Sequence, residues 1–445
     1  MKTLLQKYWY RLRSSLWFVP ATMAFLAVAL ALCAVGLDKT VTNDWLQLLG
    51  WSYSGGAEGA SLLLGTVAGS MIAIAGTVFS MTLVALSLAS SQLGPRLLRN
   101  FMRDTANQVV LGTFVATFLY CLLVLRTIRR ADEVAFVPHL SISIGVLLAI
   151  VSVGVLIYFI HHISVSIQAD QVVARVGREL ADGIDRLFPA DLGNPGADVS
   201  GETSEAKLPT DFARQACPVG ALADGYIQMI DADALMTLAC KEDLLLRLER
   251  RPGHYLAKGR AMLMVWPGDR VTETLAGKLN AAFVLGNQRS AAQDVEFSLQ
   301  QLVEIALRAL SPGINDPFTA VACVDRLESA LCRLAERDIP SPYRFDDHGQ
   351  LRLVASGATF AGIIDTAFNQ IRQSARSNPA VAIRMLDAIA QIAGHVSSQQ
   401  QATCLQRQAG MIVKGAREAV PEADDVLAVE VRFAAATLAL RNVRS

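Results

Sequence analysis

The densest group of polar and charged side chains surrounds one loop in the C-terminal third of the chain. Its members are Arg289, Gln293, Asp294, Gln301, Glu304, Arg308, Asn315 and Asp316. If the helices that flank 311–317 form a hairpin, then Arg308, Asn315 and Asp316 meet at its tip. The free N–H groups at the start of a helix bind anions there. We therefore expect a ligand or subunit-contact site that comprises Arg289, Glu304, Arg308, Asn315 and Asp316.

The same residues also have an ordinary structural interpretation. Glu304 and Arg308 are four residues apart, which is the spacing of a common ion pair on the surface of a helix. Asp316 precedes Pro317, and this order is typical of an N-cap followed by the first helical residue. The sequence leaves both interpretations open.

No motif of a known catalytic class is present. The chain lacks GxSxG, HExxH, a P-loop and a glycine-rich dinucleotide turn. Its six histidines are not grouped at metal-ligand spacing, and its seven cysteines form no CxxC pair, so we interpret them as reduced structural thiols. We therefore predict no catalytic residue, metal or cofactor, and an enzymatic activity is uncertain and disfavoured.

The charge of the chain argues against a nucleic-acid-binding protein. The formal charge is zero, and no basic run alternates with aromatic residues. Nucleic-acid binding is therefore not expected.

A second candidate is a stripe of small residues within the stretch 61–103, which has no charged residue between Ser61 and Gly94. Gly65, Gly76 and Ser87 are spaced by eleven residues, and Gly69, Ser80 and Ser91 repeat that spacing four residues later. Eleven residues make about three helical turns, so both series share one face of a nearly straight helix. The stripe comprises Gly65, Gly69, Gly76, Ser80, Ser87 and Ser91. Small residues let transmembrane helices pack closely. The alternative is that the stripe lines a water-filled path.

Three arginines follow this stretch at a spacing of three and four residues. Arg96, Arg99 and Arg103 would share one face of any helix that continues beyond Pro95. At the cytosolic end of a pore they would concentrate anions. They would equally serve as topology anchors that bind lipid phosphates.

His161 and His162 are the remaining candidates, at the end of the fourth apolar segment. Adjacent side chains on a helix point about 100° apart, so this pair is a poor chelate. They are either interfacial residues or participants in a proton or metal function.

The elements that position these residues begin with four apolar segments, which we place at 16–37, 61–92, 109–125 and 140–160. Each is long enough to cross a bilayer, and the second and fourth helices should extend beyond it. Most basic residues near the segment ends lie before the first segment, between the second and the third, or after the fourth. These three parts of the chain lie on the same side of the bilayer. Both termini are therefore expected in the cytosol, and the lipid bilayer is an expected partner.

The rest of the chain reads as a cytosolic α+β domain. We expect a transmembrane domain over 1–188, a linker rich in Gly, Pro and Ser over 189–218, a small β-barrel over 219–268, and a mainly helical domain over 269–445. Strand-like alternation around 225–230, 244–248 and 261–266 suggests the barrel. Helical patterns follow from 271 onward, and the helix starts at Asp316-Pro317 and Asn378-Pro379 resemble each other. Helix chemistry or an ancient duplication explains that likeness.

The chain resembles a family of predicted bacterial membrane proteins known only as domain of unknown function 2254. The resemblance rests on Gly76-Thr-Val-Phe-Ser80, Ser90-Ser-Gln-Leu-Gly-Pro-Arg96, Leu111-Gly-Thr-Phe114 and Ala309-Leu-Ser-Pro-Gly-Ile-Asn-Asp-Pro317. It implies a multi-pass protein of the bacterial inner (plasma) membrane with a cytosolic C-terminal part. It supplies no activity, ligand or catalytic residue.

These observations favour a homo-oligomeric channel or transport-related protein whose second helix lines the conduit and whose cytosolic domain regulates it. A small ion or an anionic ligand would be the species bound or moved. The alternative is a membrane-anchored sensing or scaffold protein that binds a ligand or partner through its cytosolic domain.

Overall fold

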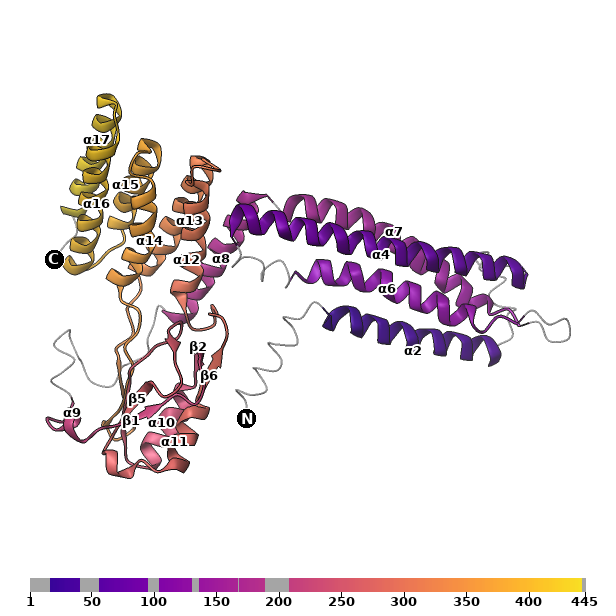
Figure 1. Cartoon of the computed structure of the whole chain (residues 1–445), viewed down its shortest axis with the longest axis horizontal. Coiled ribbons are helices and arrows are strands. Elements are labelled where there is room, and N and C mark those ends of the chain that lie inside the picture. The colour runs from indigo at the N-terminus through magenta and orange to yellow at the C-terminus, as the bar shows by residue number, and fades with distance from the viewer. Residues whose placement is uncertain are drawn as a thin grey trace. The chain divides into compact units, whose positions relative to one another are not determined.

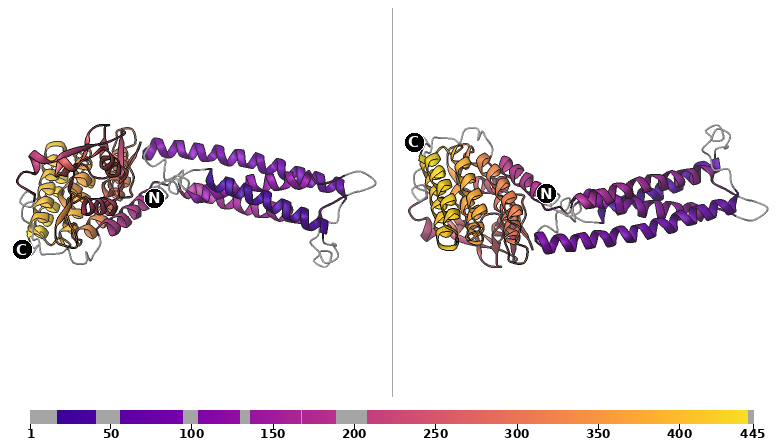
Figure 2. Two further views of the ribbon diagram at one scale, coloured as in Figure 1. Left: turned by 90° about the horizontal axis from the view of Figure 1, so that it is seen from below. Right: turned by 90° about the horizontal axis from the view of Figure 1, so that it is seen from above.

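The computed structural model describes residues 17–40, 56–94, 104–129, 136–166, 168–188 and 208–441, and it divides into two compact units, Met1–Gln171 and Val172–Ser445. In the described residues of the first unit, four helices lie side by side (Figures 1 and 2). They are α2 (Phe18–Thr40), α4 (Ala57–Leu93), α6 (Thr105–Leu125) and α7 (His139–Ser166). All four are long and apolar enough to cross a membrane. The four expected segments are thus present as helices.

Helices α6 and α7 each pack against the other three helices, and α6 makes the more extensive contacts with α2 and α4. Two glycines allow close approach. A Cβ atom at Gly112 would lie 2.5 Å from Met23 Sδ and 3.2 Å from Pro20 Cα of α2. A Cβ atom at Gly145 of α7 would lie 3.1 Å from Leu64 Cδ2 of α4. Glycine is therefore a packing residue at these two positions.

The second unit begins with α8 (Ala169–Leu187), which continues the helical pattern expected after the fourth segment. Two open sheets follow. The strands are β1 (Cys217–Gly220), β2 (Gly225–Ile230), β3 (Leu245–Leu248), β4 (Tyr255–Leu256), β5 (Ala261–Trp266), β6 (Phe283–Gly286), β7 (Tyr343–Phe345) and β8 (Leu351–Val354). Their orders are β1-β5-β3-β8-β7 and β4-β2-β6.

The small β-barrel expected over 219–268 is not supported, because the strands in the described part of the chain form these two open sheets and no closed barrel. The expected strands exist, but two of them also pair with strands that lie farther along the chain. β2 pairs with β6, and β3 pairs in parallel with β8. Residues 232–241, which precede β3, form a helix that the strand pattern did not indicate.

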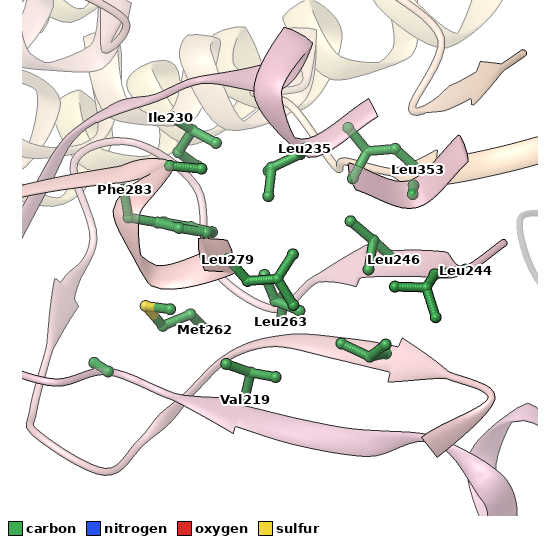
Figure 3. Close-up of a cluster of buried hydrophobic side chains, with 14 of the residues drawn as sticks. Val219, Ile230, Leu235, Leu244, Leu246, Met262, Leu263, Leu279, Phe283 and Leu353 are labelled. Atoms are coloured by element: carbon green, nitrogen blue, oxygen red, sulfur yellow. The ribbon is translucent and has the colours of Figure 1, made fainter. Parts of the chain in front are cut away.

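Short helices cover the sheets and complete a common core. They are α9 (Phe212–Gln215), α10 (Ala232–Lys241), the 3-10 helix η3 (Gly268–Arg270) and α11 (Glu273–Ala281). Figure 3 shows Leu235 of α10 and Leu279 of α11 among strand residues such as Leu246 and Leu263, all fully buried. Of the helical pattern expected from 271 onward, α11 forms only the first part: Thr272 caps it, and the residues that soon follow it form β6.

Six helices make up the remainder and pack in two rows (Figure 1). They are α12 (Val295–Ala309), α13 (Pro317–Ala335), α14 (Phe360–Ser374), α15 (Pro379–Ala393), α16 (Gln399–Ala419) and α17 (Ala423–Arg441). One row runs α12, α14, α16 and the other α13, α15, α17. The two similar helix starts, capped by Asp316 and Asn378, are thus those of neighbours in one row.

We predict that Gly112→Val lowers the stability of the bundle by about 1–3 kcal/mol, because the added atoms collide with α2. Thermal unfolding of the purified protein in detergent measures the effect. Gly154→Val in α7 is the matched control, since a Cβ atom there meets nothing within 4 Å. Equal losses in the two variants would refute the packing function of Gly112.

Candidate functional site

The small-residue stripe of α4 faces away from the helices of its own bundle. The face of α4 that packs inward carries Leu64, Ala68, Met71, Ala75 and Val78, all buried. The stripe lies on nearly the opposite side of the helix, where Gly69, Gly76, Ser80, Ser87 and Ser91 are exposed and Gly65 is partly exposed. Within the described chain, the stripe therefore does not serve to pack α4 against α6 or α7.

The glycines of the stripe have open space around them. A Cβ atom at Gly65, Gly69 or Gly76 would meet nothing within 4 Å. Gly112 and Gly145, which the stripe analysis did not single out, are the glycines in close helix contacts. Their signal in the sequence is weak, because an isolated glycine carries no spacing pattern.

The hydroxyl groups on α4 fall into two sets. Those of Thr66, Ser70, Thr77 and Thr82 donate to the carbonyl oxygen four residues earlier, and Ser91 donates to Leu88 O. Among the described residues, the Ser80 and Ser87 hydroxyls have no hydrogen-bond partner. An unpartnered hydroxyl is costly in hydrocarbon. The middle of the stripe therefore suits water or another polar surface better than lipid.

The three basic candidates Arg96, Arg99 and Arg103 lie outside the described residues. Helix α4 ends at Leu93, and the next described residue after Gly94 is Asp104.

The polar group of the C-terminal unit lies in two places, and the first is the start of α12. Arg289 donates to Asp294 Oδ2 from Nε at 2.8 Å and to Gln300 Oε1 at 2.6 Å, while Asp294 caps α12 by accepting from Phe297 N. Burial raises the pKa of Asp294, and the Arg289 charge opposes that shift. Gln293 bonds both backbone groups of Ile230 in β2. These contacts join the start of α12 to a sheet, so this part is structural.

The remaining members lie near the tip between α12 and α13. Asp316 is the N-cap of α13: its side chain accepts from Thr319 N at 3.1 Å and from Thr319 Oγ1 at 2.5 Å. The Thr319 hydroxyl, followed by backbone donors, lowers the pKa of Asp316. Asn315 is exposed with φ 49, and Glu304 and Arg308 are partly exposed on α12. The cap interpretation of Asp316 is confirmed.

The same tip carries apolar side chains that the sequence analysis missed. Phe318 is 85% exposed and Ile314 is 44% exposed. Both belong to, or directly follow, the string that carries the family resemblance. Single exposed apolar side chains are common on protein surfaces, whereas a contiguous apolar patch marks a contact site.

A polar cluster at one end of the bundle joins α6 to α7. His162 Nε2 lies 2.8 Å from Asp104 Oδ2, and Ser166 Oγ lies 3.3 Å from the same nitrogen. The Tyr158 ring stacks on His162 with centroids 5.5 Å apart. Asp104 also caps α6 by accepting from Ala106 N. The sequence pattern groups His162 only with His161, because Asp104 is 58 residues away.

A second carboxylate acts at the other end of α7. Asp38 of α2 accepts from Leu140 N and Ser141 N, both at 2.9 Å, and from Ser141 Oγ at 2.6 Å. Tyr120 of α6 donates to Ser141 O at 2.9 Å. Between the two ends, Thr117 Oγ1 and Ser152 Oγ lie 3.1 Å apart. These are interhelical bonds within an apolar bundle.

A shallow cleft in the C-terminal unit is lined by Asp243, Trp266, Arg270 and Arg352. Both arginines bind Asp243, Arg352 at 2.6 Å and Arg270 at 3.0 Å, and the bond from Arg352 is the main cause of the lowered pKa of Asp243. The arginines are therefore occupied within the chain. No group of three or more His, Cys, Asp or Glu side chains in the described residues could hold a metal ion.

Comparison with known proteins gives a family without an assigned activity. A family described as "Predicted membrane protein (DUF2254)" matches residues 13–391. Uncharacterised proteins of Mycobacterium bovis and Mycobacterium tuberculosis are 33% identical over 382 residues, which cover 84% of this chain and 71% of theirs. No solved structure matches the chain.

We predict that Asp104 and His162 are energetically coupled. Asp104→Ala and His162→Ala should each destabilise the bundle, and their combination should cost less than the sum, by about 0.5–3 kcal/mol, because they share one contact. Thermal unfolding of the four proteins in detergent measures the coupling. His161→Ala is the matched control because His161 is exposed. Additive losses would contradict the pairing.

We also predict a pH dependence at the tip of α13. Asp316→Ala should lower the free energy of unfolding by about 1 kcal/mol near neutral pH, the usual value of an N-cap. The pKa of Asp316 is lowered in the folded state, so its stabilisation is present above the ordinary value of 3.8 and is lost as pH falls below it. The difference between variant and wild type should therefore shrink in acid.

The cap of α15 supplies the control for this measurement. Asn378 accepts from Val381 N at 3.2 Å and precedes Pro379, as Asp316 precedes Pro317. Asn378→Ala should destabilise similarly but without the acid dependence, because an amide does not titrate. Parallel pH profiles for the two variants would contradict the charged cap.

Proposed function

Because the chain belongs to the DUF2254 family of predicted membrane proteins, whose matched region includes all four apolar helices, we propose that it is a homo-oligomeric channel or transport-related protein. In this proposal α4 faces a conduit shared between copies, and the C-terminal unit regulates it. A small ion or an anionic solute is the species that moves.

The observation that carries the proposal is the direction of the α4 stripe. A helix surface that faces lipid is well served by large apolar side chains, and α4 has these on its flanks, with Leu83 49% exposed and Met81 50% exposed. The stripe between them carries glycines with open space, and the Ser80 and Ser87 hydroxyls have no hydrogen-bond partner among the described residues. Water, or the same stripe of another copy, satisfies such a surface.

The proposed orientation rests on the basic residues of the sequence. From them we infer that both termini lie in the cytosol, and from the family resemblance that the four helices lie in the bacterial inner membrane. Arg96, Arg99 and Arg103 then lie at the cytosolic end of α4, where they attract anions to the conduit.

A membrane-anchored sensing or scaffold protein is the second candidate, favoured by the exposed Phe318 and Ile314 at the α12–α13 tip. In that case the stripe only joins copies, and the tip contacts a partner. Arg289 and Asp294 do not support a ligand site, because they bind each other at 2.7 Å.

We predict that the purified protein gives discrete currents in planar bilayers and that Cys substituted at Ser80 makes them sensitive to a water-soluble thiol reagent. Water in a conduit allows the introduced thiol to ionise to the reactive thiolate, and it carries the reagent to that position. Reversal potentials under ion gradients measure the charge preference. Cys33 and Cys240, which are exposed, are first replaced by Ser to remove background thiols.

Met81→Cys is the matched control for this experiment. Met81 is adjacent to Ser80 but points about 100° away around the helix and faces the flank. Block at position 80 without block at position 81 supports a lined conduit. Silence from a folded oligomer would shift the assignment to the sensing or scaffold protein.

A further inference from the structure

The outermost helix of the α13–α15–α17 row has an apolar face with no partner in the described chain. Helix α17 packs against α15 and α16 and lies at the end of the rows (Figure 1). Its inward face carries Val429, Ala436 and Leu440, all buried. On the opposite face Leu427 is 58%, Val431 59% and Leu438 62% exposed. Stacked helices need a polar outer face on the terminal element to remain soluble, and the middle of this face of α17 is apolar.

Polar side chains in the middle of α17 turn toward their own domain. Glu430 accepts from Arg417 of α16 at 2.7 Å, and Arg432 lies 3.7 Å from Asp387 of α15. Thr437 accepts from Gln406 of α16 at 3.2 Å. The neighbouring helix α16 instead exposes polar residues such as Thr403 and Lys414. The apolar outer face is therefore particular to α17.

The residues of this face have a symmetric order along the helix. Asp424, Leu427, Val431, Ala434, Leu438 and Arg441 are all exposed and follow each other at spacings of three, four, three, four and three. This is the spacing of the apolar seam between paired helices. Reversing the order leaves the spacings unchanged, so the face is complementary in register to a reversed copy of itself.

The chemistry agrees with the reversed pairing. In an antiparallel pair Leu427 meets Leu438 of the other copy, Val431 meets the small Ala434, and Asp424 meets Arg441. A parallel pair would instead place Asp424 against Asp424 and Arg441 against Arg441, which is repulsive. A membrane surface is also a poor occupant, because Asp424 and Asp425 at one end would be repelled by anionic lipids.

We propose that α17 is a dimerisation surface on which a second copy of the chain docks antiparallel, about a two-fold axis that passes between positions 432 and 433. Each contact then occurs twice, as in any two-fold interface. Anchoring both copies in one bilayer raises their effective concentration and favours such a small contact. This surface is separate from the α4 stripe and does not depend on the proposed conduit.

Cysteine cross-linking of the full-length protein tests the orientation. Two tagged forms, one with Leu427→Cys and one with Leu438→Cys, are co-expressed after the exposed Cys33 and Cys240 are replaced by Ser. We expect mild oxidation to yield a disulfide-linked dimer of the two forms together, and far less from either form alone. A pair of Thr274→Cys forms, exposed on α11, measures random collision.

Charge reversal provides the second test. Asp424→Arg and Arg441→Asp should each reduce the mixed cross-link, and the two together should restore it, because the pair is re-formed with opposite signs. Absence of the mixed cross-link, equal cross-linking of each form alone, or failure of the double reversal to restore it would overturn the proposal. All the substituted side chains are exposed, so the fold should persist, which the unfolding temperature of each variant checks.

Discussion

The first turn of α7 depends on a carboxylate from another helix. The N–H groups at a helix start have no partner within the helix, and an apolar surrounding offers no water to satisfy them. Asp38 accepts from two of these N–H groups and from the Ser141 hydroxyl. Because Asp38 belongs to α2, this bond also sets the register between α2 and α7. Tyr120 adds α6 by donating to Ser141 O.

Asp104 acts in the same way at the far end of α7. It caps α6 and binds His162, so one carboxylate satisfies a helix start and joins two helices. The bundle is thus fixed by charged groups at its ends, while its middle holds apolar contacts and the Thr117–Ser152 bond. With its packing supplied on one side by α6 and α7, α4 is left with an outer face that other molecules can use.

Local signals in the sequence predicted the elements well and their partners poorly. The four apolar helices, the caps Asp316 and Asn378, and strands β2 and β5 follow from short-range patterns. The barrel failed because β2 and β3 pair with strands that lie beyond residue 268, and no local pattern encodes such pairing. The spacing of Gly65 to Ser91 predicted that the stripe shares one face of α4. It could not predict that this face points away from the bundle, because that depends on where α6 packs. The Asp104–His162 pair was not predicted because it depends on the packing of α6 against α7, which joins residues 58 positions apart.

The two-row arrangement of α12 to α17 also shapes how the C-terminal unit opens. Each helix contacts the helices next to it along, across and diagonally between the rows, as α15 contacts α16, so stability is distributed as a series of nearest-neighbour interfaces. The α16–α17 pair has neighbours on one side only, whereas α14 and α15 have them on both. Local opening of α16 and α17 should therefore cost less free energy than opening of the inner helices, so their backbone amide hydrogens should exchange with solvent faster. In a single copy, the end of the stack should therefore open before the sheets and the inner helices do.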